Sequence, residues 1–301
     1  MKNFVFIFSL LLTTTVFAQG FTFRVLASKG ANQIKKADGS TVALKTGATL
    51  ADKDELVAAN GAYIGLMHKT GKTIEVRQPG SHTMASLEQK VAAKNVSVAS
   101  KYAQFIAGKM NEDGDVSVAS RMNATGAVSR AVGGGITMFV PTETVEALGN
   151  EIVLRWERPV DKDVDADYTV MVLDIFDEAI FEGNTSEEIL RLDLSSLNNE
   201  TGLYRVKVTT QVAGEDVSSE FIGIKEVDID EREDLVTEYN NLKEEVTGQE
   251  ALDLLIYASF YEENGMILDA ISTYDKLVNK YPDVEDFKSY YEALMVGYNF
   301  Y

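Results

Sequence analysis

Residues 251–282 read ALDLLIYASFYEENGMILDAISTYDKLVNKYP, and this stretch decides how the last third of the sequence folds. Apolar or small residues recur in it at i, i+3, i+4 and i+7, the spacing of one helix face: Leu254, Tyr257, Ala258 and Tyr261. After Gly265 the same period continues, and Pro282 stops it: Ile267, Ala270, Ile271, Tyr274, Leu277 and Tyr281. The pattern predicts two antiparallel helices that turn at Gly265.

The helix pair resembles one tetratricopeptide (TPR) repeat, a helix–turn–helix unit of about 34 residues. Two small residues, two aromatics and a proline match the family's pattern: Ala258, Ala270, Tyr261, Tyr274 and Pro282. Leu254 and Leu277 stand where the family has an aromatic residue and an alanine. The resemblance implies a helical hairpin with a groove that binds a peptide or a helix.

A single repeat leaves apolar faces uncovered, so we expect helices over 230–246 and 284–298, or another subunit, to cover it. Residues 229–301 are therefore predicted to form one TPR-like helical domain. Residues 297–301, GYNFY, are expected to be exposed. The pattern fits a binding surface as well as a self-contained cap or a dimer contact. The candidate partner-binding residues are Tyr257, Tyr261, Tyr274, Tyr298 and Phe300.

Residues 139–225 show the two-residue period of short strands, which predicts a β-sandwich. Alternating apolar sets lie at 152–156, 168–172, 190–194, 203–208 and 221–224. The run from Gly202 to Val208, GLYRVKV, is similar to the penultimate strands of fibronectin type III and other immunoglobulin-like domains. That resemblance implies a packing unit without chemistry of its own.

Aspartates at alternate positions make a calcium candidate of residues 161–167: Asp161, Asp163, Asp165 and Asp167. The EF-hand pattern fails, because Ala166 replaces the required glycine and Val172 the bidentate glutamate. A solvated loop between strands is the other interpretation, and we favour it.

Residues 21–85 also alternate, with turn signals such as Asn60-Gly61 and Pro79-Gly80 between the runs, and predict a small all-β module. The run from Gly47 to Val76 resembles the FecR-type domain of Gram-negative envelope proteins. In that family the domain passes an envelope signal to an anti-sigma segment across the inner membrane. No membrane segment follows here, so the resemblance implies only an exported β module that contacts partners.

Between these modules we expect a helix over 86–110, capped by Ser86 and packed on the preceding sheet. Residues 111–138, which include Gly133-Gly134-Gly135, are predicted to be a linker.

Residues 1–18 have the pattern of a signal peptide, with Lys2, an apolar run and a cleavage site after Ala18. No later segment is apolar enough to span a bilayer, and there is no cysteine for lipid attachment. We therefore expect an exported protein, periplasmic or associated with the outer membrane.

Charge divides the sequence. Residues 20–110 hold 13 Lys or Arg and 6 Asp or Glu, whereas the whole chain has a net charge of -19, which argues against nucleic acid as a partner. The basic part suggests contact with anionic cell-wall material or lipopolysaccharide. The simpler explanation is that the two halves attract each other or that their charges are solvated. His68 and His82 with Glu75 form a possible metal set, although nothing in their spacing brings them together.

No catalytic motif is found, and without cysteine thiol chemistry is excluded. The sequence thus predicts a multidomain α+β protein with no cofactor: an N-terminal FecR-like module, a central β-sandwich and a C-terminal TPR-like module. The leading hypothesis for function is a non-enzymatic cell-envelope adaptor that binds protein partners. The alternative is an envelope polymer-binding module that acts through residues 20–110.

Overall fold

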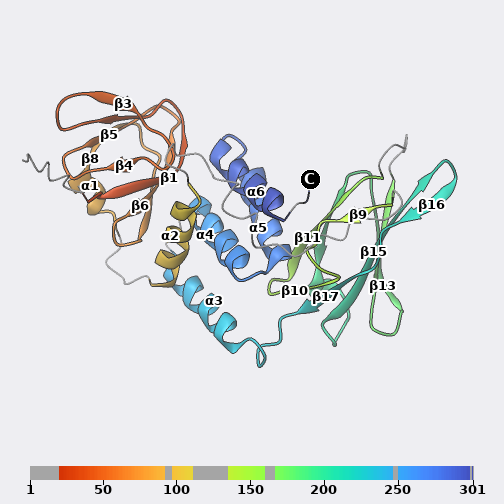
Figure 1. Cartoon of the computed structure of the whole chain (residues 1–301). Coiled ribbons are helices and arrows are strands. Elements are labelled where there is room, and N and C mark those ends of the chain that lie inside the picture. Colours follow the sequence, from red (N-terminus) through yellow and green to blue (C-terminus); the bar gives the residue numbers. More distant parts are fainter. Residues whose placement is uncertain are drawn as a thin grey trace, which may run out of the picture.

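The computed structural model describes residues 20–91, 97–110, 135–159, 167–246, 250–298 and 300. The fold is mixed α+β, with most helical residues near the C-terminal end. Figure 1 shows an N-terminal group of strands at one side, a second group at the other, and the C-terminal helices between them.

The N-terminal strands form two antiparallel four-stranded sheets, β4-β1-β6-β7 and β3-β2-β5-β8. The strands are β1 (Phe23–Lys29), β2 (Gln33–Lys35), β3 (Thr41–Ala43), β4 (Thr49–Leu50), β5 (Glu55–Ala58), β6 (Tyr63–His68), β7 (Thr73–Val76) and β8 (Gly80–Thr83). Their inward side chains, among them Phe23, Leu56 and Ile64, form one apolar core. Short helix α1 (Met84–Glu88) follows, capped by the Thr83 hydroxyl, which accepts from the Ser86 amide.

The second group consists of two sheets that face each other across a shared core. One sheet has the order β14-β11-β9 and the other β10-β17-β15-β12-β13, with β16 beside β15. The strands are β9 (Thr137–Met138), β10 (Thr144–Ala147), β11 (Glu151–Glu157), β12 (Tyr168–Leu173), β13 (Ala179–Thr185), β14 (Ile189–Asp193), β15 (Leu203–Val212), β16 (Glu215–Ser218) and β17 (Ile222–Glu226). The single tryptophan, Trp156, meets Tyr168 edge-on in this core, with ring centroids 5.3 Å apart.

The helices lie where the 3.6-residue period predicts them. They are α3 (Glu233–Glu245), α4 (Glu250–Glu263), α5 (Ile267–Lys280) and α6 (Glu285–Gly297). Gly265, with φ 74°, makes the turn between α4 and α5. The α4–α5 pair is covered by α6 and by α2 (Val98–Gly108), as a lone helical hairpin requires.

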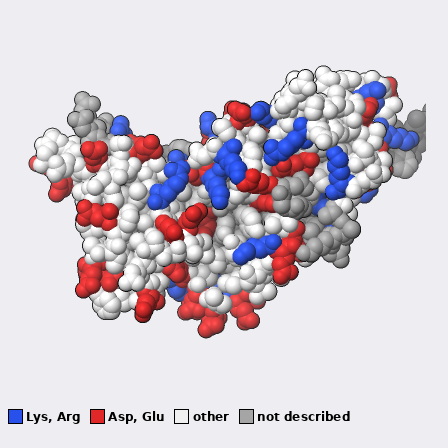
Figure 2. Space-filling model, turned by 180° about the vertical axis from the view of Figure 1, so that it is seen from behind, with Lys and Arg blue, Asp and Glu red and all other residues white. Residues whose placement is uncertain are grey.

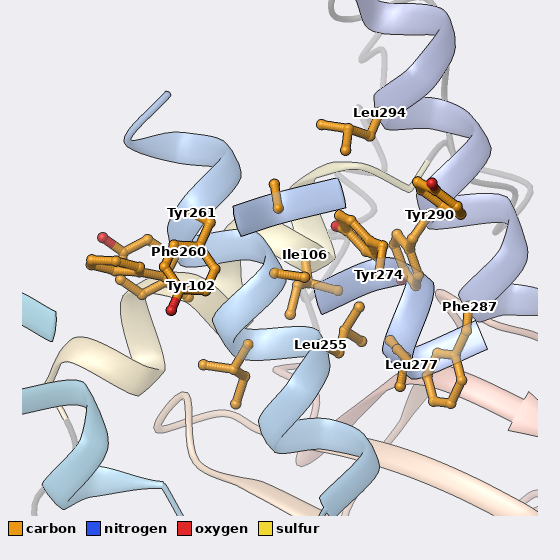
Figure 3. Packing of buried hydrophobic residues seen from close by; sticks show 14 of the residues in the cluster. Tyr102, Ile106, Leu255, Phe260, Tyr261, Tyr274, Leu277, Phe287, Tyr290 and Leu294 are labelled. Atoms are coloured by element: carbon orange, nitrogen blue, oxygen red, sulfur yellow. The ribbon is translucent and has the colours of Figure 1, made fainter. Parts of the chain in front are cut away.

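The helices do not have a core of their own, because their apolar cluster includes residues from both groups of strands. One apolar cluster joins Leu26 and Tyr63 of the N-terminal sheets, Tyr102 of α2, Val153 of β11, and the C-terminal helices. Figure 3 shows this cluster, with Tyr102 next to Phe260 and Tyr274 next to Tyr290. The helices therefore lie between the two groups of strands and pack against both.

Three expectations need correction. The single helix over 86–110 is replaced by α1 and α2, and α2 packs against α3 and α4 more than against the preceding sheet. Of the predicted linker, residues 111–134 lie outside the described residues, as does the predicted signal peptide, but Ile136 and Met138 are buried in the core between the facing sheets. No helix in the described part of the chain has the length and apolar character to cross a membrane.

Candidate functional site

A groove of about 940 Å³ opens between the C-terminal helices and the sheet β14-β11-β9. We call it the α4/β14 groove. Its walls come from the β10–β11 turn, β11, β14, α3, α4 and α5, and its lining includes Asn150, Glu151, Arg191, Asp193, Tyr239, Leu254, Tyr257, Tyr261, Thr273, Lys276 and Asn279. The groove lies beside α5, which packs against β10 and β11, whereas α4 packs against α5, α2 and β7.

Asp269 of α5 fastens the helix to the β10–β11 turn. Its two carboxylate oxygens accept hydrogen bonds from consecutive amides, Leu148 at 3.0 Å and Gly149 at 2.6 Å. A side chain at position 149 has no room, because an added Cβ would lie 2.7 Å from Oδ1 of Asp269. Burial raises the pKa of Asp269 to about 7, since removal of the carboxylate from water outweighs the two N–H donors.

Three further contacts continue this joint along α5. Leu268 reaches into the core between the facing sheets, where it is 1% exposed. The Ser272 hydroxyl accepts a hydrogen bond from the Val153 amide at 2.7 Å, which is the role that the carbonyl of a neighbouring strand would otherwise have. Arg191 of β14 pairs with Asp275 at 2.6 Å. Apolar, hydrogen-bonding and ionic contacts thus all hold α5 against the sheet.

Tyrosines form the wall of the groove opposite the sheet. Tyr239 of α3 lies 6.1 Å from Tyr257 and 5.9 Å from Tyr261, measured between ring centroids. The Tyr261 hydroxyl donates to that of Tyr239 at 3.2 Å. Burial raises the pKa of Tyr257 to about 12, so its hydroxyl stays protonated at physiological pH. The half-buried rings of Tyr239 and Tyr257 thus offer apolar surface together with hydrogen-bonding oxygens.

Charges of both signs surround the groove. Lys280 pairs with Glu250, and Glu151 and Lys276 are exposed without an ion pair to any residue that the structure places. Figure 2 shows Lys and Arg gathered toward the N-terminal strands and the middle of one face, while Asp and Glu prevail over the facing sheets. A ligand in the groove therefore contacts an aromatic wall that is surrounded by both acidic and basic side chains, and neither sign of charge dominates.

The predicted partner-binding residues fall into two groups. Tyr257 and Tyr261 line the groove, although Tyr261 is only 7% exposed. Tyr274 is fully buried, and Tyr298 is half-buried against Phe300. The expected exposure of Phe300 is wrong: it is 2% exposed, because its ring stacks on Phe139 at 5.6 Å and ties the region after α6 to the β9 region.

A buried charged group lies inside the helical core. Lys109, which follows α2, contacts Glu262 of α4, and the Tyr274 hydroxyl lies 3.1 Å from its Nζ and 3.0 Å from Glu262. The rings of Phe105 and Tyr290 flank the ammonium group. Both charged side chains are 3% exposed, so we assign this group to holding α2 against α4 rather than to binding.

The candidate metal residues do not converge. His68 contacts Thr70 and Glu88, His82 contacts the Gln78 carbonyl, and Glu75 accepts from Arg77 and from the Leu252 amide. No group of three metal-ligating side chains occurs among the residues described. Asp161, Asp163 and Asp165 lie outside them, so the calcium hypothesis stays a prediction; Asp167 is exposed.

Sequence reasoning missed several residues that shape the groove: Gly149, Arg191, Asp269 and Ser272. Gly149-Asn150 does carry a turn signal. The sequence offers one other signal for these contacts. Two polar residues, Asp269 and Ser272, flank Ala270 and Ile271, which belong to the apolar face of α5. No periodicity indicates which strand they meet.

Comparison with known protein-family models and with curated proteins found no match for the chain.

Proposed function

We propose that the protein is a non-enzymatic adaptor of the bacterial cell envelope, which holds a segment of a partner protein in the α4/β14 groove. The observation that carries the proposal is the groove itself, a volume of about 940 Å³ lined by Tyr239, Tyr257 and Leu254. Sites for small ligands and short peptides combine such apolar and aromatic surface with a few polar groups.

The chemistry of the lining favours a peptide over a reaction. Tyr257 supplies apolar area at little conformational cost, and Asn150, Thr273 and Asn279 supply groups that suit peptide amides. Asp269 is the carboxylate of the lining with a raised pKa, and both its oxygens already accept amide hydrogens. The occupation of both oxygens supports a structural role for Asp269 at the joint between α5 and the sheet.

The envelope location rests on the signal-peptide pattern and on the FecR-type resemblance. The antiparallel sheets of residues 23–83 agree with the β module which that resemblance implies. The order β10-β17-β15-β12-β13 facing β14-β11-β9 supports the immunoglobulin-like interpretation of the second group. In this proposal the two groups of strands support the helices, and the TPR-like helices shape the binding groove.

The test is selection of peptides from a displayed library on the full-length protein, followed by fluorescence anisotropy. We expect Tyr257→Ala to weaken a selected peptide at least ten-fold, about 1.4 kcal/mol, because stacking area is lost. Phe176→Ala is the matched control, since Phe176 is 74% exposed and does not line the groove. Equal binding by all three proteins, or no selected peptide, contradicts the proposal.

The alternative, binding of an anionic envelope polymer by residues 20–110, has one observation in its favour. Lys45 and Lys53 are exposed and have no ion pair among the residues the structure includes. Other cations of this region are paired, Lys29 with Asp283 and Lys101 with Glu238 among them, which lowers the free positive charge. Retention on purified cell wall that fades with added salt and with Lys45→Glu favours this alternative.

A further inference from the structure

Strand β14 is the edge of the sheet β14-β11-β9, and its pairing with β11 shows which peptide groups are left over. The Leu194 amide donates to the Asn150 carbonyl at 2.8 Å, and the Trp156 amide to the Glu188 carbonyl at 3.3 Å. Bonded pairs alternate along an antiparallel ladder, so Leu192 and Leu190 bond to β11. The peptide groups of Ile189, Arg191 and Asp193 therefore point away from it.

The outward groups of Ile189 and Arg191 are open to pairing, whereas the Asp193 carbonyl accepts from the Ser196 hydroxyl at 2.6 Å. Within the residues that the structure describes, neither the amide nor the carbonyl of Ile189 or Arg191 has a hydrogen-bond partner. Arg191 is exposed, with 59% of its side chain accessible. On β11, the amide of Val153 points away from β14, but it already donates a hydrogen bond to the Ser272 hydroxyl. An edge left unpaired in this way is a template for another strand.

The α4/β14 groove lies against this edge strand. Arg191 and Asp193 line it from β14, facing Leu254 and Tyr257 of α4. Side chains alternate between the two faces of a strand, so an added strand would turn every second side chain toward the outer face, where the helices stand. Backbone pairing and side-chain recognition thus become available to one extended ligand.

We propose that the groove takes its protein segment as an extended strand of about five residues, paired with the outward edge of β14, and with apolar or aromatic side chains at alternate positions against Leu254 and Tyr257. The inference rests on the proposed function and adds the conformation and the sequence pattern of the ligand. Five residues match the length of β14. Binding by main-chain hydrogen bonds predicts a tolerant sequence at the positions that face away from the helices.

The first test is hydrogen exchange of the full-length protein with and without a peptide selected on it. The amides of Ile189 and Arg191 are expected to exchange at least ten-fold more slowly in the complex, because they become hydrogen-bonded. Amides of β13, the edge of the other sheet, are expected to be unchanged. Unchanged exchange at Ile189 and Arg191 in a saturated complex overturns the inference.

The second test uses two substitutions at one position. Arg191→Pro removes an amide that points away from β11, a position at which an edge strand tolerates proline, whereas Arg191→Ala removes the side chain and keeps the amide. We expect the proline variant to bind at least ten-fold more weakly than the alanine variant. A peptide N-methylated at alternate nitrogens gives the same information if Arg191→Pro fails to fold; equal binding in either comparison refutes strand pairing.

The two hypotheses fail differently. If a selected peptide loses affinity with Tyr257→Ala but leaves the β14 amides unprotected, the groove is a binding site and strand pairing is wrong. If no peptide depends on Tyr257, the proposed function itself is wrong.

Discussion

Replacement of Gly149 by alanine is expected to loosen the joint between α5 and the facing sheets. The added methyl group would lie 2.7 Å from Oδ1 of Asp269, and ordinary contact begins near 3.4 Å, so the carboxylate must move by about 0.7 Å. That shift weakens the hydrogen bonds of 2.6 and 3.0 Å that Asp269 accepts. Hydrogen bonds to a buried charged group are worth about 1.5–3 kcal/mol, and we expect a loss of about 2 kcal/mol in the free energy of unfolding.

The assay is urea unfolding followed by circular dichroism, with limited proteolysis to locate the loosened region. Gly108→Ala, at the end of α2, is the matched control, because an added Cβ there meets no atom within 4 Å. We expect the control to be neutral or slightly stabilising, since alanine favours helix. Equal stability of Gly149→Ala and the unchanged protein would refute the close packing at this joint.

The remaining predictions concern charge, the residues after α6 and pH. Lys109→Ala is expected to lower the free energy of unfolding by about 3–5 kcal/mol, because it removes one partner of an ion pair whose two side chains are each 3% exposed. Lys109→Ala/Glu262→Ala is expected to cost less than the sum of the single changes, and additive losses contradict this coupling. Phe300→Ala is expected to cost about 3 kcal/mol in thermal unfolding, and an unchanged midpoint would mean that Phe300 is not docked. The folded-state pKa of Asp269, about 7, lies above its ordinary value of 3.8, so its stabilising contribution is complete below about pH 4 and is lost as the pH rises through 7. This difference in pKa corresponds to about 4 kcal/mol. The free energy of unfolding of the unchanged protein is therefore expected to decline between pH 4 and 8, and this decline is expected to be absent from Asp269→Asn. Parallel pH profiles of the two proteins contradict the prediction.

The helices were predictable because each carries its own signal. The 3.6-residue period, Gly265 and Pro282 place α4 and α5 within a few residues of their observed ends, and the need to cover a lone hairpin predicts helices on either side. Alternation predicted the longer strands β11, β12 and β15. Strand β13 was missed, because its sequence AIFEGNT has one short apolar run and no alternation.

The arrangement of the parts could not be predicted, because its determinants are single residues far apart in the sequence. Asp269 meets Leu148 and Gly149 across about 120 positions, and Asp286 accepts from the Ser28 amide across 258. Periodicity reports which face of an element is buried and is silent on what buries it. For the same reason Tyr257 was a predictable candidate, whereas the wall that Arg191 and Asp193 place opposite it was not.

In-cell photo-crosslinking from the groove tests the central claim most directly. A photoreactive residue placed at Lys276, which lines the groove, is compared with one at Glu182 on β13, outside the lining. The account predicts one discrete protein adduct from position 276, abolished by Tyr257→Ala, and none from position 182. Adducts of equal yield at both positions, or an adduct from position 276 that persists with Tyr257→Ala, would contradict it.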